Sequence, residues 1–319
     1  GPIHRANELL PQFKFQDKIQ VSNIIIGVKT MIWGYFCKLI IADKISILTT
    51  PIFKLYFEHD GLSLIIASLL FSLQIYFDFI GYSLIAIGTG KILGFTININ
   101  FNSPLSITSF KEFWHRWHIT LSKWMRDYIY IPLGGSKHKK YILSCLSILI
   151  TFLISGFWHG ITLNFILWGT THAFLYILED FIEKKTSTVY YFKKPYFRNP
   201  FIRLLKWIIF FISISFTWLI FRTENYSELI EILRKIISFS DWSLISANKY
   251  FLTTTNIIYI LIVLFALIFL QTNFIKQKIQ EIPTTILGTI TDSGFVCFCL
   301  TLIILLGDIG SQEFLYFKF

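Results

Sequence analysis

The run SLIIASLLFSLQIYFDFIGYSLIAIG, residues 63–88, decides the class of fold. It is almost wholly apolar, and as a helix it is long enough to cross a hydrocarbon core of about 30 Å. Further apolar runs lie at 24–41, 141–158, 165–178, 204–221, 257–270 and 295–307. Because a backbone inside a bilayer must satisfy its own hydrogen bonds, and no barrel-like alternation is present, these runs predict transmembrane helices.

The composition agrees with this interpretation. Of the 319 residues, 54% are hydrophobic and only 15% are charged, which is unusual for a soluble domain. We therefore predict an all-α, polytopic membrane bundle of about seven spans, with residues 1–319 forming a single membrane domain. The run at 24–41 is the weakest predicted span, because it contains Lys29 and Lys38.

The formal net charge of +10 has a membrane explanation. If 109–140 is cytoplasmic, alternation of the spans places 20 Lys and Arg residues in cytoplasmic segments and 6 in extracytoplasmic ones. This bias is the positive-inside pattern of membrane proteins. It predicts a cytoplasmic N-terminal end, an extracytoplasmic C-terminus, and a lipid bilayer rather than a nucleic acid as the partner of the basic residues.

The longest polar interruption contains SFKEFWHRWHITLSKWMRDYIYIPLGG, residues 109–135. Ser109 followed by Glu112 resembles a helix-capping pair. Aromatic and apolar residues then recur at intervals of three and four: Trp114, Trp117, His118, Leu121, Trp124, Met125 and Tyr128. The pattern predicts one amphipathic cytoplasmic helix at about 109–131. A helix lying in the headgroup region accounts for the aromatic and basic residues, but not for His118 on the apolar face.

Ionisable residues inside predicted spans are costly and therefore draw attention. Asp78, in the middle of 63–88, is interpreted as a structural acid that is hydrogen-bonded or paired with a lysine. His159 follows an apolar run and lies between Gly156 and Gly160, which predicts a break that lines a cavity. A neutral imidazole in such a place can act as a general base near pH 7. His172 is interpreted as a polar contact between helices.

Other chemistries find less support in the sequence. His115 and His118 are three residues apart, but no carboxylate or cysteine completes a metal site at a typical spacing, so we expect no metal. The four cysteines all lie in apolar runs and indicate core packing. From the residues alone, a transferase and a transporter both stay open, although a transporter is expected to show paired broken helices and only one break is visible.

The segments FKEFWHRWHITLSKWMRDYIYIPLGG, SGFWHGITLNFILWGTTHAF and QIYFDFIGYSLIAIG closely resemble the membrane-bound O-acyltransferase superfamily. The resemblance is to its bacterial envelope branch, which acetylates alginate or peptidoglycan or D-alanylates teichoic acid. It implies that His159 is the catalytic histidine of the WHG motif and that His118 is the second histidine, in the FWxRWH motif. His115 occupies a variable position of that motif. The resemblance also implies that further spans precede residue 1.

The resemblance implies a donor, a partner and a location as well. Acetyl-CoA is the expected acyl donor, bound by Trp114, Trp117, Arg126, Lys137, Lys139 and Lys140. The acceptor is expected to be a cell-envelope glycan, with peptidoglycan favoured over alginate or another exopolysaccharide, and an extracytoplasmic SGNH-type transferase is the expected partner. The implied location is the bacterial cytoplasmic (inner) membrane. The non-enzymatic alternative is an acyl-group channel or scaffold for that partner.

Overall fold

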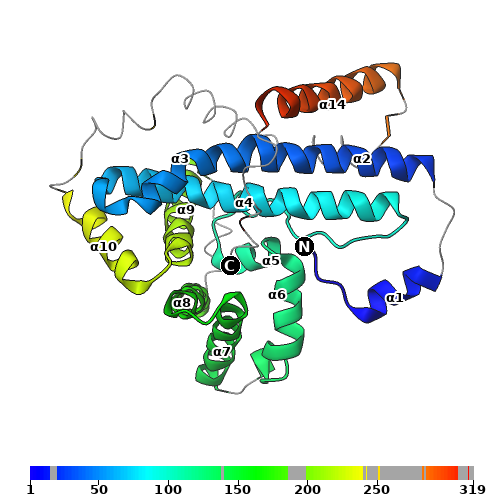
Figure 1. Ribbon diagram of the computed structural model, residues 1–319. Helices are drawn as coiled ribbons and strands as arrows, with labels where there is room; N and C mark the ends of the chain where they lie inside the picture. Colours follow the sequence, from blue (N-terminus) through cyan, green and yellow to red (C-terminus); the bar gives the residue numbers. More distant parts are fainter. Residues whose placement is uncertain are drawn as a thin grey trace. The chain divides into compact units, whose positions relative to one another are not determined.

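The computed structural model describes residues 1–14, 20–137, 140–185, 199–239, 242, 251, 282–283, 285–307 and 315. These residues form helices, turns and loops, and none of them lies in a strand, which confirms the all-α prediction (Figure 1). The chain divides into two compact units, and each is described by itself. The first contains Gly1–Lys54, Leu73–Phe101 and Ser243–Phe319, and the second contains Leu55–Ser72 and Asn102–Trp242. The single-domain expectation for 1–319 stays a prediction.

Five helical segments of the described chain are long and apolar enough to cross a membrane. They are Val21–Lys54, Gly61–Ile92, Tyr141–His159, Pro200–Arg222 and Gly288–Leu306. The expected span at 165–178 lies within a helix that is not among these five, and the expected span at 257–270 lies outside the described residues. The structure therefore agrees with a multi-pass helical membrane protein.

The first unit is built from long helices that pack through small residues. Its elements are α1 (Ala6–Lys14), α2 (Val21–Tyr35), the π-helical turn η1 (Phe36–Ala42), α3 (Asp43–Lys54), the greater part of α4 (Gly61–Ile92) and α14 (Ile286–Leu306). A Cβ on Gly34 would lie 2.8 Å from the Gly81 carbonyl oxygen, so α2 and α4 approach too closely for a side chain at that point. Lys29 on α2 pairs with Asp292 on α14 at 3.0 Å.

A buried ion cluster lies where the π turn meets α4. Lys38 Nζ is 2.7 Å from Asp43 Oδ1 and 2.8 Å from Asp78 Oδ1, and all three residues are buried. The second oxygen of Asp78 accepts a hydrogen bond from the Leu315 N–H at 3.0 Å. The prediction that Asp78 is a structural acid paired with a lysine is confirmed. Lys38 does not weaken the span at 24–41, because its charge is neutralised inside the unit.

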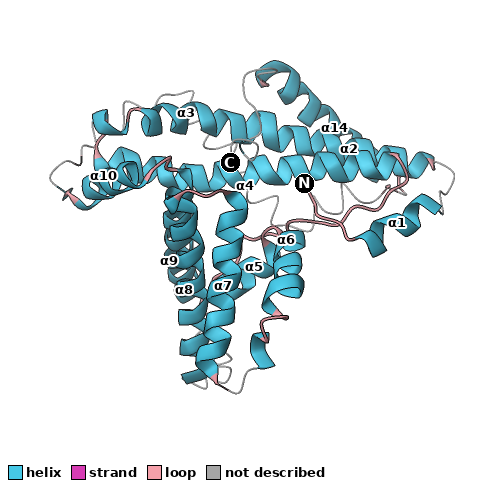
Figure 2. Cartoon of the chain, turned by 60° about the horizontal axis from the view of Figure 1, so that its bottom comes forward, coloured by secondary structure: helices cyan, strands magenta, loops and turns pink. Residues whose placement is uncertain are grey.

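The second unit contains three long helices and a set of short ones. Its elements are η2 (Tyr56–Glu58), the start of α4, α5 (Phe110–Arg116), α6 (Ile119–Met125), the π turn η3 (Arg126–Tyr130), η4 (Gly135–Lys137), α7 (Tyr141–His159), α8 (Leu163–Lys185), α9 (Pro200–Arg222) and α10 (Tyr226–Ile237). Helices α7, α8 and α9 lie side by side (Figure 2). Asn164 Nδ2 at the start of α8 donates to the Thr223 carbonyl oxygen just after α9, at 2.7 Å.

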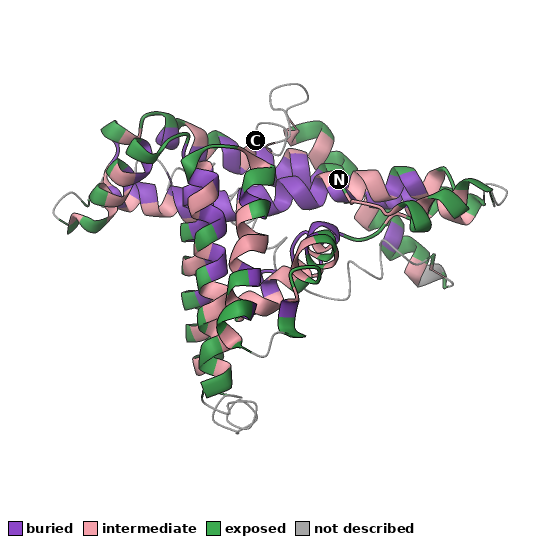
Figure 3. Cartoon of the chain, turned by 90° about the horizontal axis from the view of Figure 1, so that it is seen from below, coloured by how far each residue is buried: buried purple, intermediate pink, exposed green. Residues whose placement is uncertain are grey.

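Many residues of these three helices are exposed (Figure 3), and many of the exposed side chains are apolar. The exposed side chains include Ile142, Leu146, Ile154 and Phe157 on α7 and Ile209, Ile212 and Phe216 on α9. In water such surfaces would drive association, whereas lipid tails cover them without cost. The exposed faces are therefore those of helices immersed in a bilayer.

The prediction of one continuous helix at about 109–131 is wrong. Helix α5 ends at Arg116, His118 adopts the left-handed conformation with φ +41° and ψ +54°, and α6 begins at Ile119. A single left-handed residue cannot continue a right-handed helix, so the aromatic face expected from unbroken periodicity is split in two. The predicted cap is present, because the Ser109 hydroxyl accepts a hydrogen bond from the Glu112 N–H.

Candidate functional site

His159 is the last residue of α7, and the chain leaves the helix at Gly160, as predicted. Helix α7 passes through Gly156 without a break. A Cβ at Gly156 would lie 2.4 Å from the Phe165 carbonyl oxygen of α8. Only glycine therefore lets the two helices approach this closely. The second predicted glycine ends the helix and the first allows the packing, and together they fix the position of His159.

Aromatic rings from three helices surround the His159 imidazole. Its ring centroid lies 4.9 Å from that of Trp158, 5.1 Å from that of Trp168 on α8 and 5.1 Å from that of Phe221 on α9. All three contacts are edge-on. His159 is half-buried, so these rings shield only part of its imidazole from solvent. A neutral imidazole in this place can accept a proton.

His118 lies close to His159, and both imidazoles contact Trp158. Its ring centroid is 6.2 Å from that of Trp158, and its side chain is 2% exposed. Burial lowers the pKa of His118 well below its ordinary value of 6.5, and the neighbouring His159 lowers it further. The His118 imidazole is therefore neutral at pH 7, with one nitrogen that donates a hydrogen bond and one that accepts.

The backbone at His118 is strained, and hydrogen bonds around it hold the strain. Left-handed geometry costs a non-glycine residue on the order of 1–3 kcal/mol. The His118 carbonyl accepts from the Ser122 N–H at 3.0 Å, and the Ser122 hydroxyl donates to the Trp117 carbonyl at 3.2 Å. The Asn102 N–H donates to the Arg116 carbonyl at 3.0 Å. The left-handed backbone that turns the His118 side chain inward therefore lowers stability, and strained residues of this kind are typical of functional sites.

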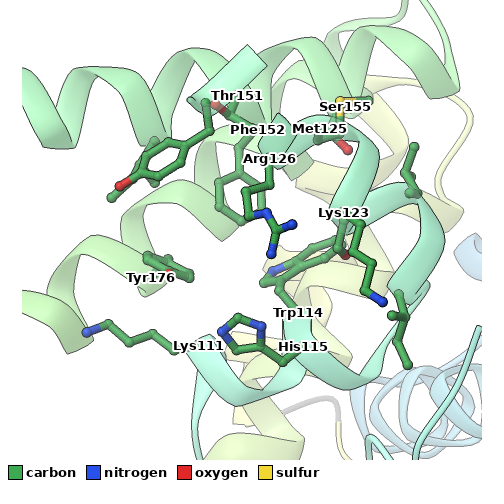
Figure 4. A pocket seen from close by; sticks show the side chains of 15 residues that line it. Lys111, Trp114, His115, Lys123, Met125, Arg126, Thr151, Phe152, Ser155 and Tyr176 are labelled. Atoms are coloured by element: carbon green, nitrogen blue, oxygen red, sulfur yellow. The ribbon is translucent and has the colours of Figure 1, made fainter. Parts of the chain in front are cut away.

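A cavity of about 210 Å³ lies between α5, α6, α7 and α8 (Figure 4), and neither His118 nor His159 is among the residues that line it. Its lining is basic and aromatic: Lys111, Trp114, His115, Lys123, Arg126, Tyr130, Phe152 and Tyr176, with Ser155, Thr151 and several apolar residues. The Arg126 guanidinium points into the cavity, toward Trp114 and His115. Ser155 lies four residues before His159 on α7, so the cavity wall and the catalytic candidate are one helical turn apart on the same face.

Lys111 at the cavity edge is held by two acids from the end of α8. Its Nζ lies 2.6 Å from Asp180 Oδ1 and 2.7 Å from Glu183 Oε2. Burial alone would lower the pKa of Lys111, but these hydrogen bonds outweigh burial and raise it. Burial alone would likewise raise the pKa of Asp180, but the hydrogen bonds from Lys111 and Lys184 outweigh it and lower the pKa. The network ties α5 to α8 at the edge of the cavity.

The other predicted donor-binding residues are distributed more widely. Trp114 and Arg126 line the cavity. Trp117 is buried against Phe113 and Trp218 and does not line it. Lys137 and Lys140 are exposed on the loop before α7 and do not line it either, while Lys139 lies outside the described residues. Their roles stay predictions.

Sequence reasoning missed two features of the site. The cavity wall formed by Phe152 and Tyr176 depends on the packing of α7 against α8, which periodicity does not reveal. The interpretation of His172 as a polar contact between helices is wrong for the described residues. Neither of its nitrogens has a hydrogen-bond partner in the described part of the chain, and aromatic rings enclose it. The sequence signals for these aromatic surroundings were the two tryptophans within 114–118 and the WGTTH segment of α8.

Comparison with known proteins identifies the family. The model of the membrane-bound O-acyltransferase family matches residues 1–223. The peptidoglycan O-acetyltransferase of Helicobacter pylori is 34% identical over 78% of this chain and 46% of its own length. The probable alginate O-acetylase AlgI of Pseudomonas aeruginosa is 34% identical over 79% of this chain and 46% of its own length. The teichoic acid D-alanyltransferase of Streptococcus thermophilus is 26% identical over 69% of this chain and 57% of its own length. The chain spans about half the length of the relatives it matches. The chain belongs to the membrane-bound O-acyltransferase family.

Proposed function

We propose that the protein is a membrane O-acyltransferase that takes an acetyl group from acetyl-CoA at the cytoplasmic face and passes it through the bundle for O-acetylation of a cell-envelope glycan. The observation that carries the proposal is the basic, aromatic cavity one helical turn from His159. Cations suit the phosphates of the donor, and an apolar lining suits its thioester arm. The names of the relatives support acyl transfer to an envelope polymer.

In the proposed reaction, His159 accepts the proton of an acceptor hydroxyl. The hydroxyl oxygen attacks the thioester carbonyl carbon, and a tetrahedral intermediate forms. That intermediate collapses with cleavage of the C–S bond, and the departing thiolate takes the proton back from the His159 imidazolium. The neutral His118 donates a hydrogen bond to the oxyanion of the intermediate.

The donor's charged end is assigned to the cavity mouth. Arg126 and Lys123 bind phosphate oxygens there, and Trp114 packs against the arm. Lys137, Lys139 and Lys140 are proposed as further cations for the phosphates of the donor. Trp117 stacks on Phe113, which contacts the cavity-lining Trp114, so its proposed role is to position Trp114.

The proposed location is the bacterial cytoplasmic membrane, with the C-terminus extracytoplasmic. An SGNH-type extracytoplasmic transferase is the proposed partner that completes transfer to the glycan. Peptidoglycan is the favoured polymer. Alginate is the alternative, because relatives named for either polymer are equally similar to this chain, at 34% identity.

The proposal is tested with the purified protein in liposomes, its SGNH-type partner and radiolabelled acetyl-CoA. His159→Ala is compared with wild type, and Phe157→Ala, on the exposed face of the same helix, serves as the matched control. Loss of a general base lowers the rate by about 10²- to 10⁴-fold, whereas the control keeps the wild-type rate. If well-inserted His159→Ala protein transfers acetyl groups at the wild-type rate, the enzymatic proposal fails and an acyl-group channel or scaffold takes its place.

A further inference from the structure

His172 lies in the middle of α8 and is 1% exposed. Neither Nδ1 nor Nε2 has a hydrogen-bond partner within the described chain. A neutral imidazole carries one donor and one acceptor, so two polar groups are buried there without compensation. The proposed reaction assigns no role to this third histidine.

Three tryptophans surround His172, each from a different helix. The ring-centroid distances are 5.0 Å to Trp114 on α5, 4.8 Å to Trp168 on α8 and 6.3 Å to Trp218 on α9. Each of these indole N–H groups is itself buried without a partner in the described part of the molecule. The cluster therefore holds five unpartnered polar atoms, two on the imidazole and three on the indoles around it.

Such a cluster is costly unless something pairs with it. An unsatisfied buried donor or acceptor costs about 1–3 kcal/mol, and native proteins contain only a few per 100 residues. A single buried polar atom without a partner does not indicate a binding site, and the indole N–H of Trp33 in the first unit is an example. Five atoms around one side chain, next to a candidate active site, indicate a group that binds there.

The chemistry of the cluster specifies that group. Indoles only donate hydrogen bonds, so the cluster offers four donors and one acceptor. Its complement is rich in acceptors, as carbonyl oxygens are. The cluster also connects the cavity to His159. Trp114 lines the cavity, its ring centroid lies 5.9 Å from that of Trp168, and the ring centroid of Trp168 lies 5.1 Å from that of His159.

We infer that His172 is a specificity-determining residue that, with the surrounding indole N–H groups, binds the amide carbonyl oxygens of the acyl donor's arm between the cavity and His159. This inference rests on the proposed function, since the arm of a CoA thioester carries amides just before its thioester. The polar atoms are covered in the structure, so the arm enters with a movement of the Trp114 ring that lines the cavity.

The test uses His172→Phe, which keeps a ring and removes both nitrogens. Its kcat/KM is measured with acetyl-CoA and with S-ethyl thioacetate, a thioester without amides. Trp33→Phe, which removes a buried unpartnered indole outside the cluster, is the matched control. We expect His172→Phe to lose about tenfold to hundredfold in kcat/KM for acetyl-CoA, the effect of one or two hydrogen bonds, and to keep the wild-type value for S-ethyl thioacetate.

Stability supplies the second measurement. Removing unsatisfied polar atoms leaves the melting temperature of His172→Phe at or above that of wild type, whereas a structural histidine would lower it. Trp218→Phe, which removes one indole N–H, repeats the kinetic test should His172→Phe fail to fold.

Equal losses on both donors, or unchanged kinetics for acetyl-CoA in an active protein, overturn the inference alone. A wild-type protein that transfers no acetyl group from either donor overturns the proposed function and the inference with it.

Discussion

Replacing Lys38 with methionine tests the buried ion cluster of the first unit. The Lys38 ammonium lies 2.7 Å and 2.8 Å from two carboxylates, and the three side chains are between 3% and 5% exposed. At an effective dielectric constant of about 20, each attraction is about 6 kcal/mol before desolvation is subtracted. Removing one partner of a buried pair typically costs about 3–5 kcal/mol, because the remaining charges are left without compensation.

We expect Lys38→Met to lower the free energy of unfolding by about 3–5 kcal/mol, since Asp43 and Asp78 then lose the ammonium group that they share. Asp78→Asn is expected to cost less, because the amide oxygen still accepts the Leu315 N–H and Lys38 keeps Asp43. The assay is equilibrium unfolding of the purified protein in mixed detergent micelles, with the double variant closing a thermodynamic cycle. A Lys38→Met protein within about 1 kcal/mol of wild type would refute the reasoning.

Further predictions concern the second unit. Arg126→Gln should raise KM for acetyl-CoA by about tenfold, the effect of one charge-assisted hydrogen bond. Lys137→Gln, at a residue that does not line the cavity, should change KM less, and steady-state kinetics measure both. His118→Asn should keep the fold because asparagine tolerates the left-handed backbone, yet lower kcat; circular dichroism and kinetics separate the two effects, and a wild-type kcat would contradict the oxyanion role. Because the pKa of Lys111 is raised, its contribution to stability is complete below pH 10.5 and is lost as pH rises through the pKa of the folded protein. Because the pKa of Asp180 is lowered, its contribution is complete above pH 3.8 and is lost as pH falls through the pKa of the folded protein. The stability difference between wild type and Lys111→Gln should therefore be flat in thermal unfolding from about pH 5 to 9, and a steep slope in that range would contradict the ion pairs.

The sequence was sufficient where local rules decide the structure. Apolar run length predicted the helices, Ser109 and Glu112 marked the start of α5, and Gly160 marked the end of α7. Asp78 was predicted to be hydrogen-bonded or paired with a lysine, because an isolated charge is too costly at that depth, and the structure shows the pairing with Lys38. Each of these depends on neighbours in the chain or on the solvent alone.

The sequence was insufficient where tertiary contacts override periodicity. The left-handed His118 depends on hydrogen bonds from Asn102 and Ser122, and nothing in 109–131 alone predicts it. The pairing of Lys111 with Asp180 joins residues 69 positions apart. Within the described chain, the nitrogens of His172 lack a hydrogen-bond partner because tryptophans from three helices enclose them, and the sequence shows these tryptophans without showing that they meet at His172.

The most direct test of the central claim follows the acetyl group across a membrane. Proteoliposomes hold radiolabelled acetyl-CoA at the face that carries 109–140, and the SGNH-type partner with its glycan is present at the other face. The account predicts label on the far side with wild-type protein and a loss of about 10²- to 10⁴-fold with His159→Gln. Label that crosses equally in both proteins, or never crosses in wild type, would contradict it.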